Sequence, residues 1–400
     1  MKFELEFLTR ACGDTSAEDG LKIDAVLEPL SGPGSPVKPA IYEGGRYQTD
    51  RRWACAEDDE STKVVVIDNV PSQANRLEDA LRRNRNTISN PELVLNLACC
   101  EGLPVHLPRM ISSLQFPHRN ADAYLRDSLL GGEDFEKTYL GKSILAATPW
   151  NCGALMSWFP QSLLYGFWQS HLGGIQTKHA RAWVSEIVGW GPAKSDTRTV
   201  GLKGDPLNLS IDEKIRFNPK DQIGWTFAGG PRVAGIKNGK LSEIGHGQVP
   251  FMKDSDASPA AVSFARITQR STLSLAQLRR VSLSAPNGTT DDQLAEQNAA
   301  MRALLVSLGL HAHFLAFGSG FALRSGAELR PRNRTVTWLG ECEDHVLEIS
   351  GVEETSALLD LALKQARYVR VPLDGWNTGP KMLQPKDALK RVIDKAWPVR

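Results

Sequence analysis

The residues best suited to chemistry in this sequence lie between positions 318 and 334, where a Gly-Ser-Gly run precedes a cluster of arginines. Glycine has no β-carbon, so Gly318 and Gly320, on either side of Ser319, would let the backbone approach a ligand closely. The cluster consists of Arg324, Arg330, Arg332 and Arg334. Guanidinium groups pair well with phosphate oxygens. This order of residues favours a site that holds a long anion, and the alternative is a hairpin whose arginines are solvated.

Regular elements must position these residues. Thr290 and Gln293 have the spacing of a capping box, and the apolar residues after them repeat at helical spacing, which predicts a helix that ends at Gly309. The alternation over residues 310–317 predicts a strand. A turn at the Gly-Ser-Gly run and a second strand over residues 321–325 would then bring the arginines to one edge.

A second group of candidate binding residues lies on a predicted helix that begins at Pro71 and Ser72 and ends near Arg85. The first N–H groups of a helix are free to bind phosphate, and Arg76 lies one turn after Ser72. The same charges also suit an ordinary exposed helix, as the ion pairs Glu78–Arg82 and Asp79–Arg83.

The middle of the sequence is rich in tryptophan. Trp168 is the best candidate to stack on a base, because it lies among polar residues in the run Phe167–His171. Most of the other tryptophans are expected in the core, since aromatic side chains bury large areas.

Motifs of known enzyme classes are incomplete. The run Leu140–Ser143 contains Gly-Lys-Ser, but Glu136 stands where a P-loop needs its first glycine. His311 and His313 would share one face of a strand without a third metal ligand at a convincing distance. The run Cys342–His345 lacks the accompanying signature of a catalytic cysteine. The sequence therefore predicts a protein that is not an enzyme and that needs no metal or cofactor.

The composition is that of an ordinary globular protein, with 400 residues, 41% hydrophobic and 23% charged. The net charge of +1 excludes a histone-like mode, so nucleic acid would have to bind through local patches. The six cysteines form no Cys-x-x-Cys pair, which gives a zinc ribbon little support. Acidic residues interrupt the N-terminal segment and no run of about 18 apolar residues occurs, so we expect a soluble, cytoplasmic protein that binds no membrane.

Further elements are expected along the chain. Residues 192–259 are dense in Gly, Pro, Asp and Lys, which predicts a loop-rich inserted subdomain. The predicted strands are Leu21–Leu30, Thr62–Ile67, Ala261–Gln269 and Tyr368–Val371, and the predicted helices are Asn120–Leu130, Ser274–Arg280 and Ser350–Ala366.

Several short motifs occur in the order of a known family between Leu21 and Leu329. They are Ser72–Glu78, Pro117–Asp122, Gln161–His171, Arg181–Glu186, Ser274–Arg280 and Ala303–Arg324. Together they resemble the large backbone subunit of CRISPR type I-U (also called I-G) Cascade, a RAMP-superfamily protein of the Cas-seven type. No motif in residues 192–259 matches, and the stretch from Arg330 onward is only weakly similar.

The resemblance implies an α+β fold, a ferredoxin-like (RNA-recognition-type) palm with inserted finger and thumb elements. The palm would be divided between residues 1–191, with inserted helices, and residues 260–400, with the glycine-rich hairpin. Several copies would line one CRISPR RNA (crRNA) as a helical filament and hold it for pairing with target DNA in antiviral defence, together with other Cascade subunits. The expected RNA-binding residues are Ser72, Gln73, Asn75, Arg76, His118, Arg119, Trp168, His171, Arg181, Gly318, Ser319, Gly320 and Arg324.

Two other classes of function stay open. The first is an RNA endonuclease of the same superfamily, for which His118, His171 and Asp24 are the best candidate catalytic residues. The second is a metabolic α/β enzyme, which a nucleotide or small substrate would stabilise while RNA had no effect.

Overall fold

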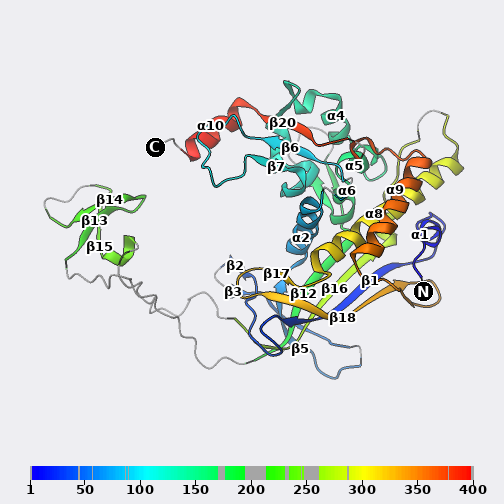
Figure 1. Cartoon of the computed structure of the whole chain (residues 1–400), viewed down its shortest axis with the longest axis horizontal. Helices are drawn as coiled ribbons and strands as arrows, with labels where there is room; N and C mark the ends of the chain where they lie inside the picture. The colour runs from blue at the N-terminus through cyan, green and yellow to red at the C-terminus, as the bar shows by residue number, and fades with distance from the viewer. Residues whose placement is uncertain are drawn as a thin grey trace.

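A computed structural model gives the fold of the chain (Figure 1). It describes residues 2–43, 46–55, 57–85, 87–88, 90–169, 176–193, 213–229, 234–244, 246, 261–285, 288–376 and 378–397.

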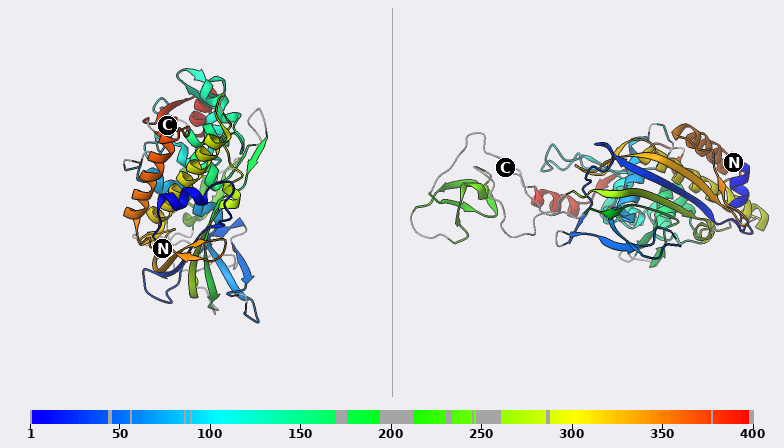
Figure 2. Two further views of the ribbon diagram at one scale, coloured as in Figure 1. Left: turned by 90° about the vertical axis from the view of Figure 1, so that its right-hand side faces the viewer. Right: turned by 90° about the horizontal axis from the view of Figure 1, so that it is seen from below.

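The centre of the molecule is a curled antiparallel sheet with helices on one face (Figure 1, Figure 2). Its central elements, in chain order, are β1 (Gly20–Pro29), α2 (Val70–Arg83), β12 (Trp183–Pro192), β16 (Phe264–Ser274), α8 (Asp291–Phe317) and β18 (Glu328–Leu339). The strands lie in the order β18-β1-β16-β12, and each neighbouring pair is antiparallel. A βαββαβ chain with this strand order is the arrangement of a ferredoxin-like fold. The predicted α+β palm is confirmed.

Alternation of side chains explains β1. Leu21, Ile23 and Ala25 are buried, whereas Lys22 and Asp24 face the solvent side, as the period of two in a strand requires. The strand was predicted within one residue at each end. Two edge strands, β5 (Thr62–Asp68) and β4 (Thr49–Arg52), extend the sheet beyond β12.

Helix α8 is longer than the sequence predicted. Its capping box at Thr290 and Gln293 is present, but the helix continues through Gly309 to Phe317, so the predicted strand over residues 310–317 is wrong. The second half is buried between the sheet, α2 and α9 (Val352–Tyr368), and a helix buried on all sides has no apolar stripe to identify it. A β-carbon on Gly309 would lie 2.8 Å from Cε3 of Trp183. This glycine therefore allows close packing of helix on sheet and does not end the helix.

Helix α8 is also the one helix of the described chain that is long and apolar enough to cross a membrane. Most of that apolar segment is buried inside the protein, as in the core helix of a soluble protein.

Other predicted elements have mixed outcomes. The helix predicted from Ser350 is α9, and the short helix after Ser274 is α7 (Leu275–Leu278), capped by the Ser274 side chain. The strand predicted over 368–371 is absent, because α9 runs to Tyr368. The helix predicted over 120–130 is reduced to α3 (Ala123–Arg126), and its last residues form β8 (Ser128–Leu130).

A second sheet lies beyond the C-terminal end of α2 and has the order β7-β6-β20-β8-β9 (Figure 1). It consists of β6 (Leu93–Asn96), β7 (Met110–Ser112), β8, β9 (Glu133–Asp134) and β20 (Lys381–Pro385). Strand β20 is parallel to β6 and comes from the C-terminal stretch. The end of the chain therefore completes a subdomain that the first half begins.

The predicted insertion begins and ends at one point of the palm, since Pro192 in β12 faces Phe264 in β16. Its described part contains a small sheet of β13 (Ile215–Asn218), β14 (Asp221–Phe227) and β15 (Lys237–Gly239). Figure 1 draws this sheet apart from the palm.

Candidate nucleic-acid interface

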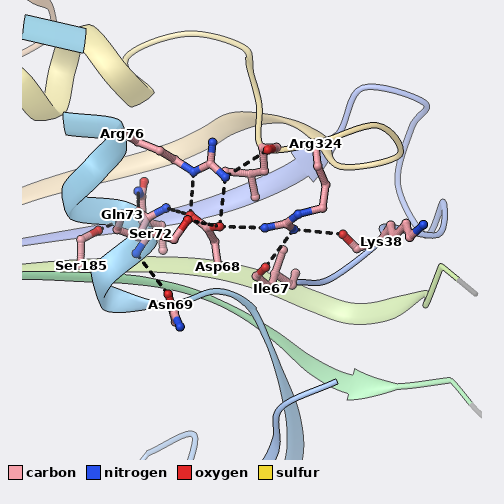
Figure 3. A network of polar contacts seen from close by, with 11 residues as sticks. Lys38, Ile67, Asp68, Asn69, Ser72, Gln73, Arg76, Ser185 and Arg324 are labelled. Carbon is pink, nitrogen blue, oxygen red and sulfur yellow. Dashed lines mark hydrogen bonds and ion pairs between the residues drawn. The ribbon is translucent and has the colours of Figure 1, made fainter. Parts of the chain in front are cut away.

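The two arginines expected to bind phosphate, Arg76 and Arg324, meet at one buried carboxylate (Figure 3). Asp68, at the end of β5, has no exposed side-chain surface. It accepts hydrogen bonds from Nε and Nη2 of Arg76 at 2.8 and 3.1 Å and from Nη2 of Arg324 at 2.8 Å. The arginine side chains are 26% and 25% exposed. The two guanidinium groups and one carboxylate carry a net charge of +1.

Backbone carbonyls hold the same arginines in place. Arg76 Nη2 donates to the Leu323 carbonyl, and Arg324 Nη1 donates to the carbonyls of Lys38 and Ile67. No described residue accepts a hydrogen bond from Arg76 Nη1 or Arg324 Nε. These are the donors that a further anion could use.

The first turn of α2 differs from the prediction. The helix begins at Val70, and the side chain of Asn69 caps it by accepting a hydrogen bond from the Ser72 N–H at 3.1 Å. Ser72 Oγ donates to Asp68. The prediction that Ser72 opens the helix and offers a free N–H group is therefore wrong.

Gln73 connects Asp68 to a buried chain of hydrogen bonds. Its Nε2 donates to Asp68 at 2.6 Å, and its Oε1 accepts from Ser185 Oγ. Ser185 Oγ accepts from Ser271 Oγ at 2.8 Å, and Ser271 Oγ contacts Nδ1 of His313 at 3.3 Å. Because the Ser271 hydroxyl already donates to Ser185, Nδ1 of His313 must carry the proton of this contact. The chain therefore runs in one direction from α8 to the carboxylate.

The other arginines of the predicted cluster are also paired. Arg330 and Arg332 form ion pairs with Glu28. Arg334 lies 4.7 Å from the centre of the Phe314 ring and donates to the carbonyls at the end of α8. These three side chains therefore have partners within the protein, where they hold strands and helix together.

The glycine run after α8 has an ordinary backbone. Gly318 caps the helix in a right-handed conformation, with φ −65°, and neither Gly318 nor Gly320 has a positive φ. Ser319 and Gly320 are exposed before the short strand β17 (Phe321–Ala322), and Ser325 lies outside that strand. Asn75 is also exposed, on α2.

A cavity of about 750 Å³ brings most of the remaining predicted residues together. The described residues that line it are Val70, Pro117, His118, Arg119, Ala121, Tyr165, Gly166, Phe167, Trp168, Lys178, His179, Ala180, Arg181 and Val184. None of these lining residues is acidic. The start of α2, the hairpin β10 (Phe167–Gln169) and β11 (Thr177–His179), and the loop before β12 contribute to its wall.

Arg119 forms the inner wall of this cavity. Its Nε and Nη2 donate to both carboxylate oxygens of Glu78 at 2.8 Å, and its Nη1 donates to the Gly166 carbonyl. Burial raises the pKa of Glu78, while Arg119 acts in the opposite direction. The predicted surface pair Glu78–Arg82 is therefore wrong, whereas the pair Asp79–Arg83 is present.

Trp168 lies at the outer wall, and 67% of its surface is exposed. It faces Lys178 across the hairpin, with Nζ 5.9 Å from the ring centre. Arg181 and His118 are exposed on the same cavity. In the described part of the chain, neither Lys178 nor Arg181 has an acidic partner. The cavity therefore combines the exposed ring of Trp168, the two cations Lys178 and Arg181, and the guanidinium of Arg119, whose charge is balanced by Glu78.

The inner surface contains further polar groups. The Tyr165 hydroxyl is buried without a hydrogen-bond partner among the described residues. His179 contacts the Leu163 carbonyl through Nε2 at 3.1 Å, and burial lowers its pKa, so the ring is neutral near pH 7. His171, the last predicted residue of this group, lies outside the described residues.

Sequence reasoning missed Asp68, Lys178 and Tyr165. Strand pairing alone would have indicated Lys178, because a hairpin centred on the polar run after Trp168 places it opposite this ring. Asp68 ends an apolar strand directly before the helix, which is a common place for a polar group that holds neighbouring elements.

The enzyme motifs form no site. Residues of the Gly-Lys-Ser run lie within α4 (Tyr139–Leu145), where the Gly141 N–H donates to the cap residue Thr138. His311 contacts Thr355 of α9, on a different side of α8 from His313. Within the described ranges, no group of three His, Cys, Asp or Glu side chains is arranged to hold a metal ion.

Comparison with known proteins gives one match. A search of curated proteins finds no significant relative. The model of the family described as CRISPR-associated protein GSU0053 matches residues 21–193, the region that contains β1, α2, β12 and every residue of the cavity. Residues 21–193 of the chain are therefore similar to this CRISPR-associated family.

Proposed function

We propose that the protein is the crRNA-binding backbone subunit of a type I Cascade complex of the I-U/I-G kind. The observation that carries the proposal is the cavity, which combines an exposed aromatic face with unpaired cations in a CRISPR-associated family region. Proteins that bind single strands without reading sequence use these two kinds of contact. The ferredoxin-like palm is the expected framework for them.

In this proposal, Trp168 stacks on a base while Lys178 and Arg181 contact neighbouring phosphates. Exposed Asn75, Ser319 and Gly320 and the outward donors of Arg76 and Arg324 would continue the path. Asp68 then acts as a positioning residue, because it holds both guanidinium groups while leaving them a net positive charge. Copies of the chain, target DNA and other Cascade subunits are the proposed partners.

The proposed role is not catalytic. The endonuclease alternative needs residues that act together, but Asp24 lies on the outer face of the sheet in an ion pair with Arg270, in a different cavity from His118. Pure protein that cleaves RNA, with or without a divalent metal, would favour the endonuclease instead.

Co-expression with a repeat-spacer RNA tests the proposal. We expect an elongated particle with several copies, and the number of copies should rise in steps when the spacer is lengthened, because unlike surfaces on one chain associate head to tail. Two scrambled spacers should bind within about tenfold of each other, roughly 1.4 kcal/mol. Protein that purifies free of RNA, or a copy number that ignores spacer length, contradicts the proposal.

The salt dependence of binding tests the location. Changing Lys178 and Arg181 together to Ala should lower the slope of log affinity against log salt by about 0.7 for each lost phosphate contact. The matched control changes two exposed lysines on other surfaces, Lys142 and Lys364. An equal loss in both double variants would mean that binding follows overall charge and not this cavity.

A further inference from the structure

A second cavity lies at the opposite end of α2 and has a volume of about 850 Å³. It is bounded by the end of α2, the β7-β6-β20 part of the second sheet and the last turn of α9. No residue of the proposed RNA path lines it. Its chemistry therefore requires a separate explanation.

The floor of this cavity is apolar. In the sheet, Val94 of β6 faces Met382 on one side and Ser112 on the other, and Met110 lies two residues before Ser112. These side chains share one face of the sheet, because alternate residues of a strand point the same way. Met110 and Met382 are both exposed to solvent. Methionine adapts its shape to a flat apolar or aromatic surface.

One wall presents hydrogen-bond acceptors that have no partner. Glu92, directly before β6, is only 5% exposed, and its Oε1 has no hydrogen-bond partner among the described residues. Its other oxygen lies 3.9 Å from Nη1 of Arg85, an ion pair that is too long for a hydrogen bond. Asn90 Oδ1 is buried and equally unpaired. A buried carboxylate oxygen without a donor is costly, so a bound donor here would be stabilising.

The rim is positively charged. Arg82, Arg85 and Arg367 line the cavity. Arg82 is occupied by Asp79, with bonds of 2.6 and 3.1 Å, whereas Arg85 is 58% exposed and Arg367 is exposed. Arg85 makes only the long ion pair with Glu92, and Arg367 has no acidic partner among the described residues. Both guanidinium groups can therefore bind an anion at the mouth, while the floor and wall hold a flat group with N–H donors.

We propose that this cavity binds a nucleotide whose base carries an amino group, with guanine as the best fit. A base would lie on the methionine floor, its amino and ring N–H groups would donate to Glu92 and Asn90, and its phosphate would pair with Arg85 and Arg367. Guanine fits best because its N1–H and N2 amino group are adjacent donors on one edge, whereas uracil has no amino group. The volume is within the range of small-molecule sites. The inference goes beyond the proposed function, since it assigns base selectivity to a site outside the sequence-blind path.

Calorimetry on the full chain with GMP and UMP tests the proposal. We expect GMP to bind at least about tenfold more tightly than UMP. Glu92→Gln should remove this preference, because it replaces one acceptor oxygen with a donor and removes the charge. Arg85→Ala and Arg367→Ala should weaken both nucleotides equally. The matched control Arg83→Ala, on the same helix end but outside the cavity, should change nothing.

The two sources of such a ligand are a free nucleotide and an unpaired guanine in RNA. Short single strands with one guanine, placed terminally or internally, are compared with all-uridine strands. If the ligand is a guanine in RNA, the strands with guanine should compete with GMP and the all-uridine strands should not. Trp168→Ala should leave GMP affinity unchanged, so failure of the proposed RNA path and failure of this site are separate results. Absence of GMP binding at millimolar concentration overturns the inference, as does equal affinity for GMP and UMP. If Glu92→Gln does not keep the thermal midpoint, the arginine variants and the GMP/UMP ratio decide.

Discussion

The Asp68→Asn substitution should strongly destabilise the protein. Asp68 is fully buried and is the common acceptor for two guanidinium groups, the Ser72 hydroxyl and the Gln73 amide. Asparagine keeps the size of the side chain, removes the charge and points an N–H group at neighbours that are themselves donors. Arg76 and Arg324 would then be positive charges without a compensating carboxylate.

The structure sets the size of the effect. Removing one partner of a buried ion pair costs about 3 to 5 kcal/mol. The two arginines keep about a quarter of their surface in contact with water, which places the expected loss in the free energy of unfolding near the lower limit, about 3 kcal/mol. Asp79→Asn is the matched control: this carboxylate also serves two arginines but is 35% exposed, so its loss should cost less than about 1 kcal/mol.

Urea unfolding of the three proteins, followed by circular dichroism, measures the difference directly. The slope of the free energy against urea must be the same in all three for the comparison to hold. If Asp68→Asn is no less stable than Asp79→Asn, then Asp68 does not hold β5, α2 and the segment after β17 together, and the reasoning about it is wrong.

Three further outcomes are expected. Burial lowers the pKa of His313 to about 3, whereas an unfolded histidine has a pKa of about 6.5. The neutral ring therefore contributes its full stability above about pH 6.5, and this contribution is lost as the pH falls toward 3, by up to about 1.4 kcal/mol between pH 6 and 5. In His313→Asn, the free energy of unfolding measured with urea should no longer show this pH dependence. Trp168→Ala should weaken RNA binding by about 1 to 3 kcal/mol, the value of one stacked base, whereas Trp150→Ala, equally exposed elsewhere, should not. Gly309→Ala should cost about 1 to 3 kcal/mol in spite of better helix propensity, because its methyl group would press on buried Trp183, and a stabilised variant in the same assay would contradict the packing described.

Much of the palm was predictable where one face of an element meets water. Strand β1 alternates between buried and solvent-facing residues, so its period of two was visible in the sequence. The second half of α8 is buried on every side, and its sequence has no periodic contrast to distinguish a helix from a strand. The sequence predicted that Gly309 ends the helix. Glycine is needed there because Trp183 packs closely against it, and Trp183 is too distant in the sequence for a local pattern to show this contact.

The candidate site was predictable in part for a similar reason. Local motifs identified His118, Arg119, Trp168 and Arg181, and the structure brings them to one cavity. The same motifs could not reveal which arginines already have acidic partners, because Arg324 meets Asp68 only through tertiary folding. Charge alone therefore overestimated the number of free cations.

The hydrogen-bond chain from His313 to Asp68 has a consequence for how the palm reaches a single structure. Apolar contacts between a helix and a sheet tolerate small shifts along the helix axis, since one methyl group can replace another. The hydrogen-bond chain is less tolerant, because a slip of α8 by one residue would move Nδ1 of His313 away from the Ser271 hydroxyl. Asp68 accepts from the Gln73 amide, which leaves Gln73 Oε1 to accept from Ser185 and so sets the direction of the hydrogen bonds back to His313. The hydrogen-bond chain thus favours the native position of α8 over shifted positions in which its apolar contacts would be equally good.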